Sequence, residues 1–175
     1  MNEEEKKISG QTVSEAKFDD KKVKKVAIYS RTNSRDEESV IDVEKETELL
    51  MEKIQEHDNW EFYKKYTDKG LYESSRRCRR TELNKMLQDA KELKIDIILC
   101  TSLARFARNI GESIDVLLRL KRENPEHPVG IYFANEDYYS LDFNPLIDSE
   151  LIPLLMKRSK DRQKAGLKPS EKKNG

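Results

Sequence analysis

Residues 95–109 read IDIILCTSLARFARN, and this stretch decides the fold. Its first eight residues, 95–102, form an apolar run that stops at a threonine and a serine, which is typical of a buried strand. Two arginines, Arg105 and Arg108, follow shortly after the end of this run. The stretch therefore predicts a buried strand with guanidinium groups beyond its carboxyl end.

Apolar runs and amphipathic stretches alternate along the rest of the chain. The runs are short, apolar or aromatic and bounded by polar turns, as strands are. The stretches between them repeat apolar residues every three or four positions, as helices do. This alternation predicts an α/β fold with a mainly parallel four-stranded sheet flanked by helices on both faces. The expected strands are 25–30, 60–68, 95–102 and 129–134, and the expected helices are 36–57, 81–93 and 110–122.

The 175 residues suffice for one domain with a hydrophobic core and tails. Residues 1–24 mix both charges without periodicity, which predicts a disordered charged tail. The folded domain is expected over residues 25–142, followed by a short C-terminal helix and a basic tail over 143–175. Residues 157–175 carry eight Lys or Arg against two acids, so this end is either a solvated tail or a nonspecific contact to phosphates.

Composition excludes several classes of protein. The formal net charge is zero, which argues against a uniformly basic nucleic-acid binder but not against a local basic patch. There is no signal peptide or spanning segment, and Cys78 and Cys100 form no disulfide framework, so we expect a cytoplasmic protein that does not contact membranes. His57 and His127 lack metal-ligand spacing, and no glycine-rich phosphate loop is present. We therefore expect no metal and no cofactor.

Cationic and polar residues follow each of the first three expected strands. Function in open α/β sheets gathers beyond the carboxyl ends of the strands. Arginines gathered there without a metal can bind a phosphodiester bidentately, and they can stabilise the extra negative charge of a five-coordinate phosphorus. Alternatively, they pair with the acidic helix 36–57 on the surface. The residues are Arg31, Asn33 and Ser34 after the first strand, Arg80 at the end of the loop after the second, and Arg105 and Arg108 after the third.

Four segments, in this order, resemble the catalytic domain of serine recombinases, the resolvase/invertase group and its large relatives. They read VAIYSRTNS, DKGLYESSRRCRRTEL, DIILCTSLARFARN and VGIYFANEDYYSLD. The strand followed by L-x-R-F-x-R-N is the strongest part, then Y-x-R at Tyr29 and Arg31, then R-x-x-L at Arg80 and Leu83. The resemblance covers residues 25–142 and implies a resolvase-like catalytic domain.

The resemblance implies a role in site-specific DNA recombination. In this family a serine hydroxyl attacks the backbone phosphate and forms a 5′-phosphoserine link, arginines bind the phosphate, no metal takes part, and four subunits act on two DNA sites. DNA is therefore an expected partner, together with further copies of the chain or a related recombinase. Carried over to this chain, the catalytic and DNA-binding arginines are Arg31, Arg80, Arg105 and Arg108.

The chain departs from the family at the nucleophile. The family pattern Y-x-R-x-S places Asn33 where the serine belongs, and an amide has no hydroxyl for phosphoryl transfer. Ser34 comes one residue late, so it is either a substitute nucleophile, if the loop bends, or a turn or capping residue. A second departure lies in the first expected helix, where Glu44 or Glu46 stands at a position that is glutamine in the family. In addition, no separate DNA-binding domain is expected after the catalytic domain.

Three hypotheses remain open. In the first hypothesis, the chain is a recombinase catalytic domain. In the second, it is a catalytically silent relative that binds DNA or pairs with a true recombinase. In the third, it is an unrelated α/β domain whose arginines are structural. Because Asn33 occupies the nucleophile position, the sequence leaves open whether the protein is an enzyme.

Overall fold

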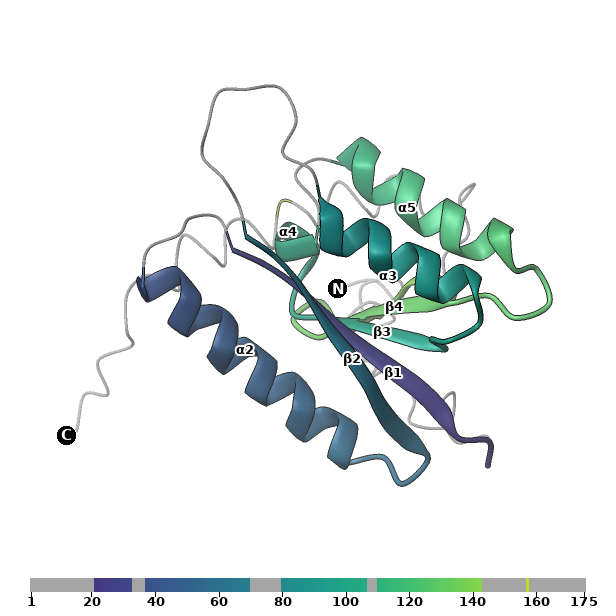
Figure 1. Ribbon diagram of the computed structural model, residues 1–175, viewed down its shortest axis with the longest axis horizontal. Helices are drawn as coiled ribbons and strands as arrows, with labels where there is room; N and C mark the ends of the chain where they lie inside the picture. Colours follow the sequence, from purple (N-terminus) through teal and green to yellow (C-terminus); the bar gives the residue numbers. More distant parts are fainter. Residues whose placement is uncertain (1–20, 33–36, 70–79, 107–109, 143–156, 158–175) are drawn as a thin grey trace, which may run out of the picture.

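The computed structural model describes residues 21–32, 37–69, 80–106, 110–142 and 157. At its centre lies a five-stranded sheet with the strand order β2-β1-β3-β4-β5 (Figure 1). The first four strands run parallel to one another, and β5 joins the edge antiparallel to β4. The strands are β1 (Lys24–Thr32), β2 (Trp60–Lys69), β3 (Ile97–Cys100), β4 (Gly130–Phe133) and β5 (Tyr138–Tyr139).

Helices cover both faces of the sheet, because the inner strands are apolar on both sides. Along β1, Val26 and Ile28 pack with residues of α2 on one face, whereas Ala27 and Tyr29 pack with residues of α3 and α5 on the other. Figure 1 shows α2 on one side of the strands and α3 and α5 on the opposite side. The helices are α2 (Glu37–Gln55), α3 (Thr81–Lys91), α4 (Leu103–Phe106) and α5 (Ile110–Glu123), with a 3-10 turn η2 (Ser140–Asp142) after β5.

The predicted α/β class and the mainly parallel sheet are confirmed, and all four expected strands form. The fifth strand is an addition to the four that the sequence indicated. Asp137 adopts a left-handed backbone conformation with φ 48°, and its carboxylate accepts a hydrogen bond from the Tyr132 hydroxyl at 2.6 Å. This tight turn folds β5 back onto the end of β4.

Helix limits differ from the expected ones by a few residues. α3 ends at Lys91, two residues before the expected limit, and Leu93 then takes a left-handed conformation with φ 59° that ends the helical path. The short helix α4 lies within the segment expected to follow the third strand as a loop. Most of the expected tails, residues 1–20 and 143–175 apart from Lys157, lies outside the described residues.

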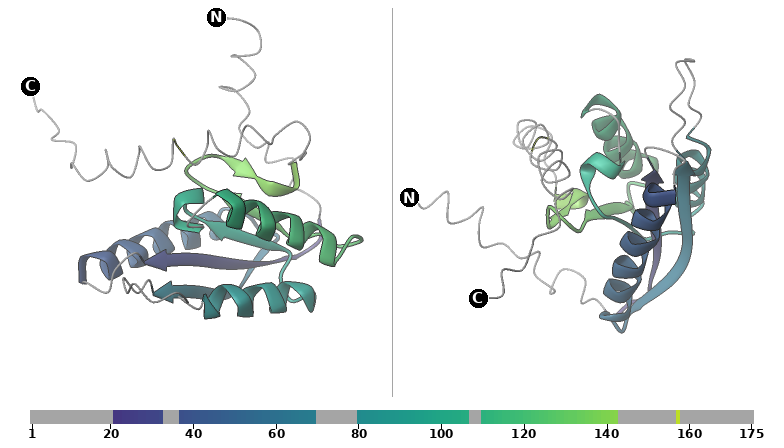
Figure 2. Two further views of the ribbon diagram at one scale, coloured as in Figure 1. Left: turned by 90° about the horizontal axis from the view of Figure 1, so that it is seen from above. Right: turned by 90° about the vertical axis from the view of Figure 1, so that its left-hand side faces the viewer.

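Parallel pairing brings the carboxyl ends of the strands together. β1 and β2 lie side by side and end on the same side of the molecule (Figure 2), where Arg31 pairs in register with Asp68. α4 begins three residues after the end of β3 and contacts β1, so it lies at this same edge. Among the helices described, none has the length and apolar character needed to cross a membrane.

Candidate functional site

Arg31, near the end of β1, reaches across to the short helix after β3. Its terminal Nη2 donates a hydrogen bond to the main-chain carbonyl of Ala104 at 3.3 Å. Ala104 directly precedes Arg105 in α4, so the first and third strand ends are connected by this contact. The two arginines therefore reach the same four-residue helix from different parts of the sequence.

α4 is fixed in place by its cap and by its apolar side chains. The Ser102 hydroxyl accepts the main-chain N–H of Arg105 at 3.2 Å, as a helix-capping serine does. Glu136 accepts the N–H of Leu103 at 3.3 Å. Leu103 and Phe106 are completely buried, which anchors the helix in the core. Arg105 is thereby carried at a defined position beside the sheet edge.

Arg80 lies inside the protein, immediately before α3. Only 8% of its surface is exposed, and its guanidinium lies over the rings of Tyr29 and Phe106, at 5.4 and 5.8 Å from their centroids. It donates hydrogen bonds to the Tyr29 hydroxyl, at 2.7 Å, and to the Phe106 carbonyl, and it forms an ion pair with Glu112 of α5 at 2.5 Å. Arg80 therefore ties β1, α4 and α5 together.

Tyr29 and Asp68 complete this buried network. The Tyr29 hydroxyl donates to the Asp68 carboxylate at 2.9 Å, and the same carboxylate accepts the main-chain N–H groups of Glu82 and Leu83, each at 3.0 Å. Asp68 thus satisfies two of the free N–H groups at the start of α3. Burial, reinforced by Asp68 and opposed by Arg80, raises the pKa of Tyr29 far above its ordinary range, so the phenol stays protonated and can donate.

Arg105 contacts the helix on the other face of the sheet. Its Nε donates to Oε1 of Glu46 in α2 at 3.2 Å, and the Thr101 hydroxyl donates to Oε2 of the same carboxylate at 3.3 Å. The side chains of Arg105 and Glu46 are 15% and 20% exposed. Burial raises the pKa of Glu46, and the charge of Arg105 opposes that rise.

The sequence-predicted residues divide into two groups. Arg31, Arg80 and Arg105 all contact or belong to α4, so arginines from three separate segments of the chain gather around one short helix. Asn33, Ser34 and Arg108 lie outside the described residues. The alternative that arginines pair with the acidic helix 36–57 also has a counterpart in the structure, since Arg105 pairs with Glu46.

Sequence reasoning did not single out Glu112 and Thr101 as parts of this site. Glu112 pairs with Arg80 from 32 residues away, and no local pattern joins the two. Asp68 did give a local signal, because an acid at a strand end ahead of a helix is suited to bind free N–H groups. Of Glu44 and Glu46, the structure places Glu46 at the site, which the sequence register left open.

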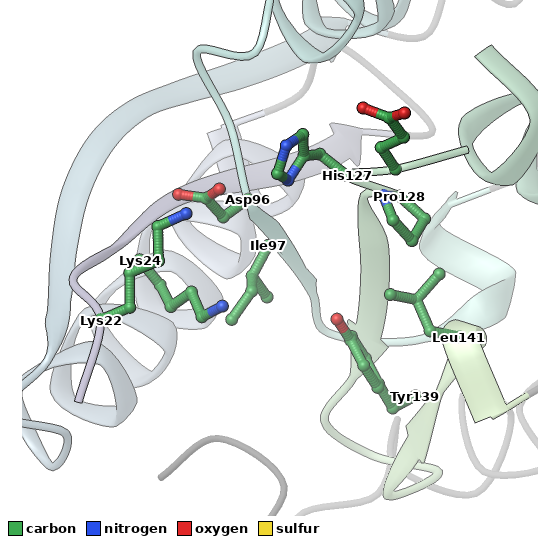
Figure 3. A pocket seen from close by; sticks show the side chains of 9 residues that line it. Lys22, Lys24, Asp96, Ile97, His127, Pro128, Tyr139 and Leu141 are labelled. Carbon is green, nitrogen blue, oxygen red and sulfur yellow. The ribbon is translucent and has the colours of Figure 1, made fainter. Parts of the chain in front are cut away.

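A hollow of about 310 Å³ lies at the opposite edge of the sheet, where the strands begin (Figure 3). Its lining mixes Lys22, Lys24 and His127 with the acids Asp96 and Glu126, so it favours no single ligand charge. Among the described residues, no group of three or more His, Cys, Asp or Glu side chains is placed to hold a metal ion. The arginine cluster around α4 is therefore the stronger candidate site.

The sequence matches the family model described as Resolvase, N terminal domain, over residues 26–146. The fold is similar to the crystal structure of a resolvase family site-specific recombinase from Streptococcus pneumoniae, with a TM-score of 0.58 and 23% identity, covering 82% of this chain and 93% of that one. It is also similar to the N-terminal catalytic domain of TP901-1 integrase, with a TM-score of 0.52 and 20% identity over 81% of this chain and 98% of that one. A comparison with curated proteins gives no significant match.

Proposed function

This chain belongs to the resolvase family, and from that membership we propose that it acts in site-specific DNA recombination, with Arg31 and Arg105 at α4 binding the phosphate of a DNA strand. The proposed ligand is the DNA backbone, and the proposed partners are further copies of the chain or a related recombinase. The observation that carries the proposal is the gathering of Arg31, Arg80 and Arg105 around one short helix at the carboxyl edge of the sheet.

Arg31 and Arg105 are the arginines best placed to contact a phosphate. Both lie at the sheet edge and both are partly exposed, whereas a phosphodiester could not reach a fully enclosed guanidinium. Guanidinium groups bind phosphate oxygens bidentately and stabilise negative charge that grows during phosphoryl transfer. Arg108 extends the same set by sequence, three residues beyond Arg105.

Arg80 takes a different part in the proposed site. Its guanidinium is already engaged by the Tyr29 hydroxyl, the Phe106 carbonyl and Glu112. Direct contact with DNA would require at least one of these partners to move. In the arrangement described, Arg80 supports the phosphate arginines by holding α4 against β1, and a contact of its own with the phosphate belongs to a rearranged state.

The nucleophile position distinguishes two forms of the proposal. In the first, Ser34 replaces the serine missing at residue 33: its oxygen bonds to phosphorus and its proton is lost to solvent, the P–O3′ bond breaks, and O3′ takes up a proton from solvent to leave a free 3′-hydroxyl. In the second, Asn33 leaves the protein catalytically silent, and it binds DNA or pairs with a recombinase that cleaves. The amide of Asn33 itself cannot form the ester link.

A nicked suicide substrate separates the two forms. DNA with a nick close to the crossover point traps any covalent protein–DNA adduct, because the nicked strand diffuses away before it can be rejoined. An adduct from the wild-type protein that maps to Ser34 supports the active form. If wild type gives no adduct and Asn33→Ser gives one at residue 33, the protein is a silent relative with an intact phosphate site.

Binding to mixed-sequence DNA tests the premise shared by both forms. Phosphate contacts make affinity fall as salt rises, with a slope that reflects the number of contacts. Arg105→Ala should weaken binding and lower that slope by about one contact. DNA binding that neither responds to salt nor changes in Arg105→Ala would remove the reason to assign these arginines to DNA.

A further inference from the structure

Three elements meet at the carboxylate of Glu46. Glu46 comes from α2, Thr101 follows directly after β3, and Arg105 belongs to α4. Each carboxylate oxygen has its own donor: Oε1 accepts from Arg105 Nε at 3.2 Å, and Oε2 accepts from the Thr101 hydroxyl at 3.3 Å. Because both oxygens are engaged, the carboxylate cannot rotate freely. It therefore holds the Nε atom of the Arg105 guanidinium in a defined position.

The contact between Glu46 and Arg105 uses the Nε atom of the guanidinium. The side-chain hydrogen bond from Arg105 to a described residue is donated by Nε, and the two terminal nitrogens donate none within that part of the chain. The terminal pair forms the end-on fork that binds two phosphate oxygens at once. Glu46 therefore binds Arg105 through Nε and not through the two terminal nitrogens.

We propose that Glu46 is a positioning residue for Arg105, which holds the guanidinium by Nε so that both terminal nitrogens are presented to a DNA phosphate. The inference rests on the proposed function, because it needs Arg105 to bind DNA. Thr101 acts one step further back, by holding the second carboxylate oxygen. The competing interpretation is that Glu46 neutralises Arg105 and competes with the phosphate for it.

The two interpretations predict opposite effects of removing the carboxylate. If Glu46 positions Arg105, Glu46→Ala releases a long, flexible side chain and DNA binding weakens, although an acidic group has been removed from the site. If Glu46 competes with the phosphate, Glu46→Ala strengthens binding. Glu46→Gln keeps an oxygen that can accept from Nε and should restore most of the wild-type affinity.

The test measures binding of the full chain to a fluorescent DNA duplex of mixed sequence at several salt concentrations. A charge-assisted hydrogen bond to phosphate corresponds to about tenfold in affinity, so Glu46→Ala should lose up to about tenfold. Glu48→Ala is the matched control, since it removes an exposed carboxylate from the same helix and leaves Arg105 held. It should bind as tightly as wild type or slightly more tightly.

A double-mutant cycle isolates the positioning effect from a general effect on the fold. In an Arg105→Ala background, Glu46→Ala should cause no further loss, because the side chain that it positions is gone. Thr101→Val, which keeps the charge of Glu46 but frees one oxygen, should give a smaller loss that likewise vanishes in the Arg105→Ala background. This variant also serves if Glu46→Ala proves too unstable for the measurement.

Each remaining outcome overturns the inference in a recognisable way. Tighter binding by Glu46→Ala than by Glu48→Ala makes Glu46 a competitor of the phosphate. If Glu46→Ala lowers DNA affinity equally in the wild-type and the Arg105→Ala backgrounds, Glu46 contributes to folding and does not position Arg105. If Arg105→Ala leaves binding unchanged, the proposed function itself fails, and the inference fails with it.

Discussion

The hydroxyl of Tyr29 is a single group whose removal tests the buried network that Tyr29 forms with Asp68 and Arg80. It donates to Asp68 at 2.9 Å and accepts from Arg80 at 2.7 Å, and all three residues are at most 8% exposed. Tyr29→Phe keeps the ring and its packing against Phe106 while deleting both hydrogen bonds. The substitution therefore isolates the polar contribution of this position.

The expected loss of stability follows from the partners that remain. A buried hydrogen bond to a charged group contributes about 1.5–3 kcal/mol, and Tyr29 makes two of them. Asp68 keeps the N–H groups of Glu82 and Leu83, and Arg80 keeps Glu112, so neither charge is left alone. We expect Tyr29→Phe to lower the free energy of unfolding by about 2–3 kcal/mol, below the sum of the two bonds.

Urea unfolding measures this loss directly. With a slope of about 1–3 kcal/mol per molar urea, the midpoint should fall by about 0.7–3 M while the slope stays unchanged. Tyr63→Phe is the control, because Tyr63 lies on β2 with 37% of its surface exposed. A loss below about 0.5 kcal/mol in Tyr29→Phe, no larger than that of an ordinary surface substitution, would refute the view that this network stabilises the site.

Two further predictions concern the core. In Gly130→Ala the new Cβ would lie 2.4 Å from ring carbons of Tyr139, so the free energy of unfolding should fall by about 1–3 kcal/mol. Adding Tyr139→Ala to this variant should recover part of that loss. If urea titrations show no recovery, the clash with Tyr139 is not the cause. Burial raises the pKa of the Cys100 thiol to about 12, so thiol reagents at pH 8 should label Cys100 only after the protein is denatured. Mass spectrometry maps the labelled residue. Rapid labelling of Cys100 in the folded protein would contradict its burial.

Much of the fold follows from periodicity in the sequence. The apolar run of 95–102 contains β3, and its position between two amphipathic stretches is enough to predict a parallel strand. β5 gave no comparable signal, since two residues are too few for a periodic pattern. It forms because Asp137 reverses the chain, and the pairing is decided by contacts with β4 that arise only in the folded protein.

The candidate site was predictable in its cations but not in their partners. Arg31, Arg80 and Arg105 each lie near a strand end or a helix start, and parallel pairing brings such positions to one edge. Glu112 and Glu46 belong to helices on opposite faces of the sheet. Acids are common on both helices, so which carboxylate meets which arginine depends on packing that no local pattern reports.

The partners of the arginines also decide what their presence means for activity. Arg80 is bound on several sides by the protein, so it would be retained in a silent relative for stability alone. The printed side-chain contact of Arg105 engages Nε alone, and in the proposed site its terminal nitrogens serve a ligand rather than the fold. Arg80→Ala should therefore lower both the unfolding free energy, by about 3 kcal/mol or more, and DNA affinity. Arg105→Ala should reduce DNA affinity by about tenfold and stability by about 1–2 kcal/mol, less than Arg80→Ala, because the Thr101 hydroxyl still donates to Glu46. Comparable loss of stability in both variants would show that Arg105 too serves the fold.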